Sequence, residues 1–268
     1  MMPPSACQQW PADSTGQTAG KRSDPAASYT TPGDVILCSH APKVIWDVKR
    51  WIVATLIGAA TPAGAMQINV SGDQIILSGP VVWSDAADVA LTLADNPAVT
   101  TAILRNSPGG DANSGYAIGE IFRAKAMRTA VSGFCYSSCS RMFIGGRTRV
   151  FTSDFPPDQT HVGFHGHYNA DGTLNAGMVR SLHLRDWIIK FSDGKADASL
   201  VDQWVNIPVN LAMIHFYHPT ALRGHPVTTF FCHDANTKVF DCEPIAKTAL
   251  DVGVITSLDL IASHDVRD

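Results

Sequence analysis

The stretch that decides the fold is "AVTTAILRNSPGGDANSGYAIGEIFRAKAMRTAVSG", residues 98–133. Its first part is apolar and β-branched and ends at a Pro-Gly-Gly turn, which is typical of a buried strand followed by a sharp change of direction. The middle part has the apolar spacing of one helix face, formed by Tyr116, Ile118, Ile121 and Phe122. A second short strand, "MRTAVSG", follows. Strand, helix and strand at this spacing predict a βαβ unit with two parallel strands.

The flanking sequence continues the alternation of strands and helices. A strand hairpin is predicted over 67–81, a helix over 85–95, another helix start at "SSCSRMFIGG", and two longer helices over 174–191 and 197–217. A hairpin over 227–242 follows, and the tail 243–258 has the pattern of a short helix, a glycine exit and a last strand. We therefore expect residues 66–268 to form one α/β domain of stacked βαβ units with a mostly parallel sheet, plus added helices and a hairpin.

Composition limits the classes of partner. The chain has 268 residues, of which 45% are hydrophobic and 16% charged, and its net charge is −4. This length buries an ample core, and the slightly acidic balance lacks the basic footprint of a nucleic-acid-binding protein. No cysteine–histidine spacing of a zinc site and no HExxH motif is present, so neither a metal nor another cofactor is expected.

The N-terminal part differs from the rest. Residues 1–42 are rich in Pro, Ser, Thr, Gly and Ala and show no apolar periodicity. Such a segment cannot bury enough apolar surface to offset the entropy of ordering it. We interpret it as a disordered extension, or as sequence upstream of the true translation start.

A secretory signal peptide is predicted directly after this extension. Residues 43–65, "KVIWDVKRWIVATLIGAATPAGA", run from basic to apolar to small residues, as a signal peptide does, with cleavage expected after Ala65. The mature chain would then begin at Met66 and be periplasmic or secreted. Two alternatives stay open: an uncleaved membrane anchor over 51–65 and a buried core helix. The apolar run is about fifteen residues long, shorter than the roughly 20 that a spanning helix needs.

Export would place the cysteines of the mature chain in an oxidising compartment. They number four, an even count that suits disulfides: Cys135, Cys139, Cys232 and Cys242. A hairpin centred near Thr237 sets Cys232 opposite Cys242, which predicts a bond between them. For Cys135 and Cys139, four positions apart across a strand-to-helix turn, the sequence leaves the pairing open.

Two short motifs follow predicted strands and begin predicted helices. In "NSPGG", residues 106–110, the glycines allow backbone N–H groups to face an anion, such as the oxyanion of acyl transfer. In "GFCYSSCS", residues 133–140, a serine on the turn would stand at the carboxyl edge of the sheet, where ligands bind in open α/β folds. Such a serine is a candidate nucleophile, and its structural alternative is a helix N-cap.

A third motif supplies candidate bases. "HVGFHGHY", residues 161–168, reads as a strand, and its alternation would place His161, His165 and His167 on one face. The unperturbed pKa of histidine suits proton transfer near neutral pH, and a serine nucleophile needs such a base within hydrogen-bond reach.

Taken in order, "NSPGG", "GFCYS" and "GFH" resemble the Clp protease proteolytic subunit and its crotonase-like relatives. The C-x-S-x-C form and the export signal are similar to predicted periplasmic Clp-like proteins. The resemblance implies that Ser137 is the nucleophile and that His165, 28 residues later, is the base. It further implies an oxyanion hole formed by backbone N–H groups of Gly109, Gly110 and Ser138.

The resemblance also implies a third, acidic residue before the tail "ALDVGVITSL". Counting back from Gly253 gives Asp241, with Asp234 as the second choice. The tripeptide "MIH" at 213–215 copies a family triplet, but we reject His215 as the base because the surrounding pattern predicts a helix.

These features favour an exported serine hydrolase, an ATP-independent peptidase that acts on peptides or proteins, needs no ATPase partner and is compatible with a homo-oligomer. The main alternative is an inactive Clp-like binding or scaffold protein. Two further readings are a Ser–Lys dyad that uses Lys190 or Lys195, and crotonase-type acyl-CoA chemistry, which does not suit an exported protein.

Overall fold

The computed structural model describes residues 64–222, 226–234 and 237–264, which belong to the compact unit Gly58–Asp268. The predicted N-terminal extension and nearly all of the predicted signal peptide lie outside these residues. Within them, no helix combines the length and the apolar character needed to cross a bilayer.

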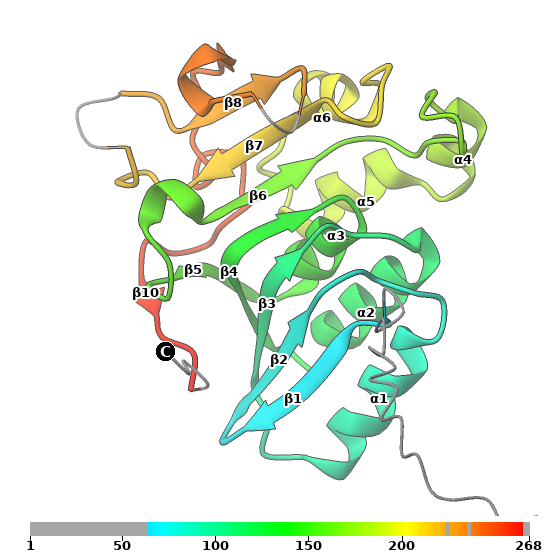
Figure 1. Cartoon of the computed structure of the whole chain (residues 1–268), viewed down its shortest axis with the longest axis vertical. Coiled ribbons are helices and arrows are strands. Elements are labelled where there is room, and N and C mark those ends of the chain that lie inside the picture. The colour runs from blue at the N-terminus through cyan, green and yellow to red at the C-terminus, as the bar shows by residue number, and fades with distance from the viewer. Residues whose placement is uncertain (1–63, 223–225, 235–236, 265–268) are drawn as a thin grey trace, which may run out of the picture. The chain divides into compact units, whose positions relative to one another are not determined.

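One sheet runs through the described residues, and its central strands are parallel (Figure 1). The order is β1-β2-β3-β4-β6-β7-β8-β9, with β5 pairing to β4 and β10 pairing to β5. Strands β2, β3, β4 and β6 run parallel in succession, while β1 and β7 to β9 are antiparallel additions. The strand bounds are β1 Gln67–Ser71, β2 Gln74–Ser78, β3 Thr101–Ser107, β4 Arg128–Tyr136, β5 Thr148–Thr152, β6 His161–Phe164, β7 Met213–Tyr217, β8 Thr229–Cys232, β9 Glu243–Pro244 and β10 Leu260–Ile261. The predicted mixed α/β fold is confirmed.

Helices connect the parallel strands and cover the sheet. Their bounds are α1 Asp85–Asp95, α2 Ala112–Ala124, α3 Ser138–Gly145, α4 Ala176–Ser181, α5 Leu184–Phe191 and α6 Ala198–Val205, with single 3-10 turns at η1 Pro157–Gln159 and η2 Val239–Asp241. Helices α2 and α3 approach each other closely, since a Cβ on Gly145 would lie 2.3 Å from the carbonyl oxygen of Gly119. The last turn of α3 is thereby fixed against α2.

The two faces of the sheet bury different residues because side chains alternate along a strand. On β2, Ile75 and Leu77 join the large core beneath the helices, whereas Ile76 joins a small cluster with Ile103 and Val150. Because both faces of the central strands are buried, their sequences are continuous apolar runs and do not alternate between apolar and polar residues.

Two predicted helices differ from the structure. The span 174–191 divides into α4 and α5 at His183, which has left-handed backbone angles. The span 197–217 is helical only to Val205. Beyond Pro208, "MIHFY" forms β7, which pairs antiparallel with β6. The prediction failed there because pairing with a distant strand outweighs the local pattern.

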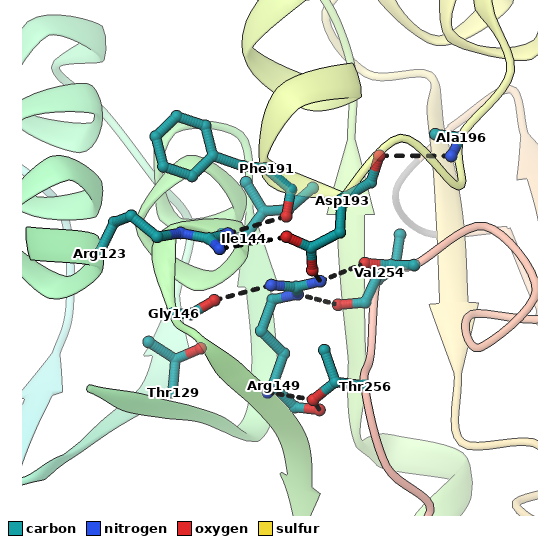
Figure 2. A network of polar contacts seen from close by, with 12 residues as sticks. Arg123, Thr129, Ile144, Gly146, Arg149, Phe191, Asp193, Ala196, Val254 and Thr256 are labelled. Carbon is teal, nitrogen blue, oxygen red and sulfur yellow. Dashed lines mark hydrogen bonds and ion pairs between the residues drawn. The ribbon is translucent and has the colours of Figure 1, made fainter. Parts of the chain in front are cut away.

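The predicted short helix in the tail 243–258 is also absent. Only the two-residue strand β9 and a series of turns lie there, and the last strand is β10. The tail is held instead by side-chain contacts from β5 (Figure 2). The fully buried guanidinium of Arg149 donates hydrogen bonds to the carbonyl oxygens of Gly253 at 2.9 Å and Val254 at 3.2 Å.

Asp193 balances the charge of this buried arginine. Its carboxylate accepts a hydrogen bond from Arg149 at 3.1 Å and another from Arg123 at 3.3 Å. Burial alone would raise the pKa of Asp193, but the bond from Arg149 and the two guanidinium charges lower it below its usual value. Asp193 therefore joins α2, the end of α5 and β5 at one point.

We expect Asp193→Asn to lower the free energy of unfolding at pH 7 by about 1–2 kcal/mol. Breaking a buried ion pair costs about 3–5 kcal/mol, and the 47% exposure of the Asp193 side chain reduces that figure through solvent screening. Because the folded-state pKa lies below the unfolded value of about 3.9, the contribution is present above that value and is lost as pH falls through the folded pKa. Urea unfolding of both proteins at pH 7 and pH 3 measures the difference.

Asp186→Asn is the matched control. Asp186 is 70% exposed and its contacts with His183 and Arg185 are 3.8 and 3.7 Å long. Its loss should change the free energy of unfolding by no more than about 0.5 kcal/mol. Equal effects of the two substitutions would show that the buried arginine does not depend on Asp193.

Candidate active site

Three loops bearing the sequence motifs leave the same edge of the sheet. Strands β3, β4 and β6 are parallel neighbours, so their carboxyl ends lie side by side. The glycine loop follows β3, Ser137 follows β4 directly, and His165 follows β6 directly. Ligands bind at this edge in open α/β sheets because the connecting loops converge there.

A cavity of about 460 Å³ opens among these loops. Ser137 and His165 both line it, together with Gly110. The full lining is Pro108, Gly110, Asp111, Ala112, Ser137, His165, Gly166, His167, Tyr168, Met178, Asn210 and Met213. The structure thus brings the predicted nucleophile and the predicted base into one cavity.

Ser137 occupies a strained turn between β4 and α3. Its φ is 55° and its ψ is −120°, outside the regions that residues other than glycine usually adopt. It holds the N-cap position of α3, yet its side chain makes no capping hydrogen bond. A structural capping role therefore does not explain the residue, and the half-buried hydroxyl is available to a ligand in the cavity.

His165 is held against the cavity wall with an unprotonated ring. It is 6% exposed, and no side chain bonds to either ring nitrogen among the described residues. Burial, and next the positive charge of Arg141, lower its pKa to about 3. The imidazole is consequently neutral near pH 7 and able to accept a proton. Arg141 also donates hydrogen bonds to the carbonyl oxygens of His165 and Gly166, at 3.2 and 3.1 Å, which fixes the backbone beside the ring.

The glycine loop packs directly on the Ser137 turn. Gly109 has φ 83°, and a Cβ there would lie 2.7 Å from the Cβ of Ser137 and 2.9 Å from the nitrogen of Ser138. Gly110 has φ 146°, and a Cβ there would lie 2.1 Å from the carbonyl oxygen of Val81. Both positions therefore require glycine.

The backbone N–H groups of the glycine loop and of Ser138 differ in whether they already donate a hydrogen bond. The N–H of Gly109 has a long contact of 3.4 Å with the hydroxyl of Ser107. Among the described residues, the N–H groups of Gly110 and Ser138 donate to no acceptor. Ser138 begins α3, where the first backbone N–H groups have no partner within the helix. These two N–H groups are the best candidates for an anion site.

The structure does not bring Asp241 to the cavity. Asp241 is exposed, belongs to η2 between β8 and β9, and is not among the cavity-lining residues. The reason is the added strand pair: β7 and β8 follow β6 in the sheet, so the hairpin begins two strand spacings away, roughly 10 Å. Asp234, the second choice, belongs to the same hairpin. No carboxylate bonds to His165 in the described part of the chain.

The three other candidate histidines have different surroundings. Strand β6 ends at Phe164, so the predicted single strand carrying all three histidines is too long. His161 is bonded to the hydroxyl of Tyr136 at 2.6 Å, whereas His167 lines the cavity with its Nε2 2.9 Å from the hydroxyl of Tyr116. His215 lies on β7 opposite Gly163, not on a helix, and does not line the cavity.

Sequence reasoning missed Arg141 and the far wall of the cavity. Arg141 is 1% exposed, a cation buried under both His165 and His167. The one sequence signal was a lone arginine among the small and apolar residues of α3, "SCSRMFIG". Asn210 and Met213 come to the wall from a segment that was predicted to be helical, so their position was hidden by that error.

Two disulfides are present among the described residues. Cys232 and Cys242 are joined with a Cα–Cα distance of 4.7 Å, at the place that the hairpin pattern predicts. The pairing of Phe231 with Glu243 leaves these cysteines next to each other at the end of the ladder. Cys135 and Cys139, which the sequence left undecided, are also joined, with Cα atoms 5.3 Å apart.

Comparisons with known proteins find structural similarity at low sequence identity. No protein-family model matches the sequence, and no curated protein matches it. Among solved structures, ClpP1 from Listeria monocytogenes is 14% identical, with a TM-score of 0.46 over 72% of this chain and 94% of that one. The ClpP protease catalytic domain from Plasmodium falciparum is also 14% identical, with a TM-score of 0.43 over 73% of this chain and 88% of that one.

A third solved structure is a mutant of the 1510-N membrane-bound stomatin-specific protease. It is 13% identical to this chain, with a TM-score of 0.39 over 72% of this chain and 78% of that one. Similarity at this level carries no conclusion about the reaction, which must be inferred from the cavity.

Proposed function

We propose that the chain is an exported serine hydrolase that cleaves peptide bonds without an ATPase partner. The observation that carries the proposal is the shared cavity of Ser137 and His165, in which the serine hydroxyl stands on a strained turn and serves no capping role. A neutral imidazole in the same cavity as an available hydroxyl supplies the two groups that nucleophilic catalysis by serine needs.

In this proposal Ser137 Oγ attacks the carbonyl carbon of the scissile peptide bond, and its proton passes to His165. The N–H groups of Gly110 and Ser138, with Gly109 beside them, stabilise the oxyanion that forms. His165 then gives the proton to the leaving amine, and the acyl group stays on Ser137. Water, deprotonated by His165, releases the acid product and restores the serine. The proposal does not include Asp241, since no contact supports it.

Labelling with a fluorophosphonate probe tests the proposal. We expect the purified folded protein to be labelled between pH 6 and pH 9, with the probe attached to the peptide that contains Ser137 when the digest is analysed by mass spectrometry. Circular dichroism confirms folding in the same sample. A folded protein that shows no labelling across this range would overturn the proposal.

That negative result would favour the second candidate function, binding without catalysis. Two observations favour it. No carboxylate orients His165 in the described residues, and burial lowers the pKa of its ring to about 3, far below the ordinary histidine value. An inactive relative would keep the cavity and lose turnover. Peptide binding without labelling, measured by fluorescence anisotropy, would identify this case.

Export belongs to the proposal, and its prediction concerns the mature N-terminus. The basic, apolar and small segments over 43–65 support cleavage after Ala65, and two disulfides suit an oxidising compartment. We expect N-terminal sequencing of protein recovered from the exported fraction to begin at Met66. Recovery of membrane-bound protein with residues 51–65 intact would support the uncleaved anchor instead.

We expect Gly109→Ala to lower the labelling rate by about 10²–10³-fold, the range found when one oxyanion donor is lost. The added methyl group would meet the Ser137 turn at 2.7 Å, so the glycine loop must move away from the nucleophile. The measurement is the second-order rate constant of fluorophosphonate labelling.

Gly79→Ala is the control for backbone strain. Gly79 has φ 91°, similar to the 83° of Gly109, but a Cβ there meets nothing within 4 Å. The substitution should lower stability and leave the labelling rate within about twofold. A similar loss of rate in both variants would show that strain, and not the position of the loop, controls reactivity.

A further inference from the structure

We propose that the Cys135–Cys139 disulfide is a positioning clamp that holds Ser137 in its reactive conformation. The inference rests on the proposed function and adds to it: the bridge acts on the nucleophile through the backbone and touches no substrate. We use "the clamp" for this disulfide together with the segment 135–139 that it closes.

The clamp spans the nucleophile symmetrically. Cys135 is the second-last residue of β4 and Cys139 is the second residue of α3. Ser137 lies midway between them. A covalent link between the strand and the first turn of the helix therefore limits the conformations of only three intervening residues.

The conformation of Ser137 is one that needs outside support. A serine at φ 55° and ψ −120° is strained, and strained residues persist only where the surroundings determine them. Its N–H donates to the carbonyl oxygen of Gly163 at 3.2 Å, and its own carbonyl oxygen accepts the hydroxyl of Ser140 at 2.6 Å. These are noncovalent contacts on either side of the residue. The disulfide alone fixes the separation of the two flanking elements by bonds.

The glycine loop makes the position of the turn critical. Gly109 lies so close to Ser137 and Ser138 that no Cβ fits between them. A relaxed turn would shift the hydroxyl and would also move the N–H of Ser138 away from the N–H of Gly110. The clamp consequently sets both the direction of the nucleophile and the spacing of the oxyanion donors.

The clamp is permanent in the folded protein. Both cysteines are fully buried, at 0% exposure, within the main core. A dissolved thiol therefore has no route to either sulfur without unfolding, so the bridge does not serve as a redox switch. It acts as a fixed part of the site that is made when the chain folds.

The second disulfide provides a matched comparison. Cys232 and Cys242 are also nearly buried, at 3% and 7% exposure, but they belong to a separate small cluster around Tyr217, Leu222 and Phe230. Neither lines the cavity. Loss of this bridge tests what removal of a disulfide does to stability alone.

The experiment uses the mature chain and two double variants, Cys135→Ala/Cys139→Ala and Cys232→Ala/Cys242→Ala. Labelling by the fluorophosphonate probe is followed at several probe concentrations, well below the midpoint of thermal unfolding of each protein. This separates the maximal labelling rate from the probe concentration that gives half of it. We expect the first variant to lose about tenfold in maximal rate, equal to about 1.4 kcal/mol, with the half-saturating concentration within twofold of the parent. The second variant should keep the parent's rate.

A second comparison changes no heavy atom of the protein, because it compares the reduced and the oxidised form of one variant. The Cys232→Ala/Cys242→Ala protein is unfolded, reduced with dithiothreitol and refolded without oxygen, so that Cys135 and Cys139 remain thiols. Half of it is then unfolded again and refolded with oxidised glutathione, which accepts the two electrons and two protons of disulfide formation. The reduced sample should be labelled about tenfold more slowly than the reoxidised one.

The outcomes separate the two proposals. Labelling of the parent at Ser137 with equal maximal rates in all variants and in both redox forms would overturn the clamp and leave the hydrolase intact. If every form without the Cys135–Cys139 bridge fails to fold, the clamp proposal is also overturned, because the bridge would then be needed for folding. No labelling of the parent would overturn the hydrolase and the clamp together.

Discussion

Ser137→Ala should abolish fluorophosphonate labelling and reduce peptide hydrolysis to the background rate. Removing the nucleophile of a serine hydrolase lowers kcat by about 10⁶-fold, since the covalent route through an acyl-enzyme no longer exists. The backbone at position 137 stays in its turn, so the cavity and the donors of the glycine loop remain. Labelling is measured by mass spectrometry, and hydrolysis is measured on a mixture of fluorogenic peptides.

Ser132→Ala is the control for this substitution. Ser132 lies on the same strand β4, and its hydroxyl donates to Asp154 at 2.6 Å rather than facing the cavity. The variant should be labelled at the parent's rate. Persistent labelling of Ser137→Ala would mean that another serine carries the chemistry.

Local sequence patterns predicted the part of the fold that positions the nucleophile. Strand β3, helix α2 and strand β4 follow one another in the order that residues 98–133 indicate. Their apolar patterns match their burial, because α2 packs one face on the main core while both faces of β3 and β4 are covered. The Cys232–Cys242 bridge could be predicted for the same reason: a hairpin sets its two cysteines opposite each other through local pairing.

Features that depend on distant pairing were not predictable. The segment "MIHFY" has the composition of a helix interior or of a strand, and only the pairing of β7 with β6 decides for the strand. That pairing brings Met213 to the cavity and sends the following hairpin away from it. Asp241 was assigned by counting along the sequence, and a count cannot register the strands that intervene in space.

The backbone conformation of Ser137 was not predictable either. Sequence places a serine on the turn, but the positive φ and the absence of a capping bond appear only in three dimensions. The same holds for Arg141, whose buried guanidinium contacts the backbone of His165. Both residues depart from local preference, and such departures concentrate at functional sites.

We expect His165→Ala to lower the labelling rate of Ser137 by about 10²–10⁴-fold, the contribution of a general base. His165 shares the cavity with Ser137, and no side chain of the described residues bonds to its ring nitrogens. Because burial and the charge of Arg141 lower its pKa to about 3, the ring is unprotonated from pH 6 to pH 9. The labelling rate of the parent should therefore be flat over this range, instead of rising through the ordinary histidine pKa of about 6.5.

His161→Ala and His167→Ala distinguish this assignment from its rivals. His161 is bonded to Tyr136 and does not line the cavity, so its loss should leave most of the labelling. His167 lines the cavity but bonds to Tyr116, and a single base suffices for one hydroxyl, so its loss should also be tolerated. A collapse of the rate in His167→Ala, with His165→Ala nearly unaffected, would transfer the role of the base to His167. A labelling rate that rises through pH 6.5 in the parent would contradict the neutral, buried state of His165, since only an imidazole that gains a proton there loses its ability to accept one from Ser137.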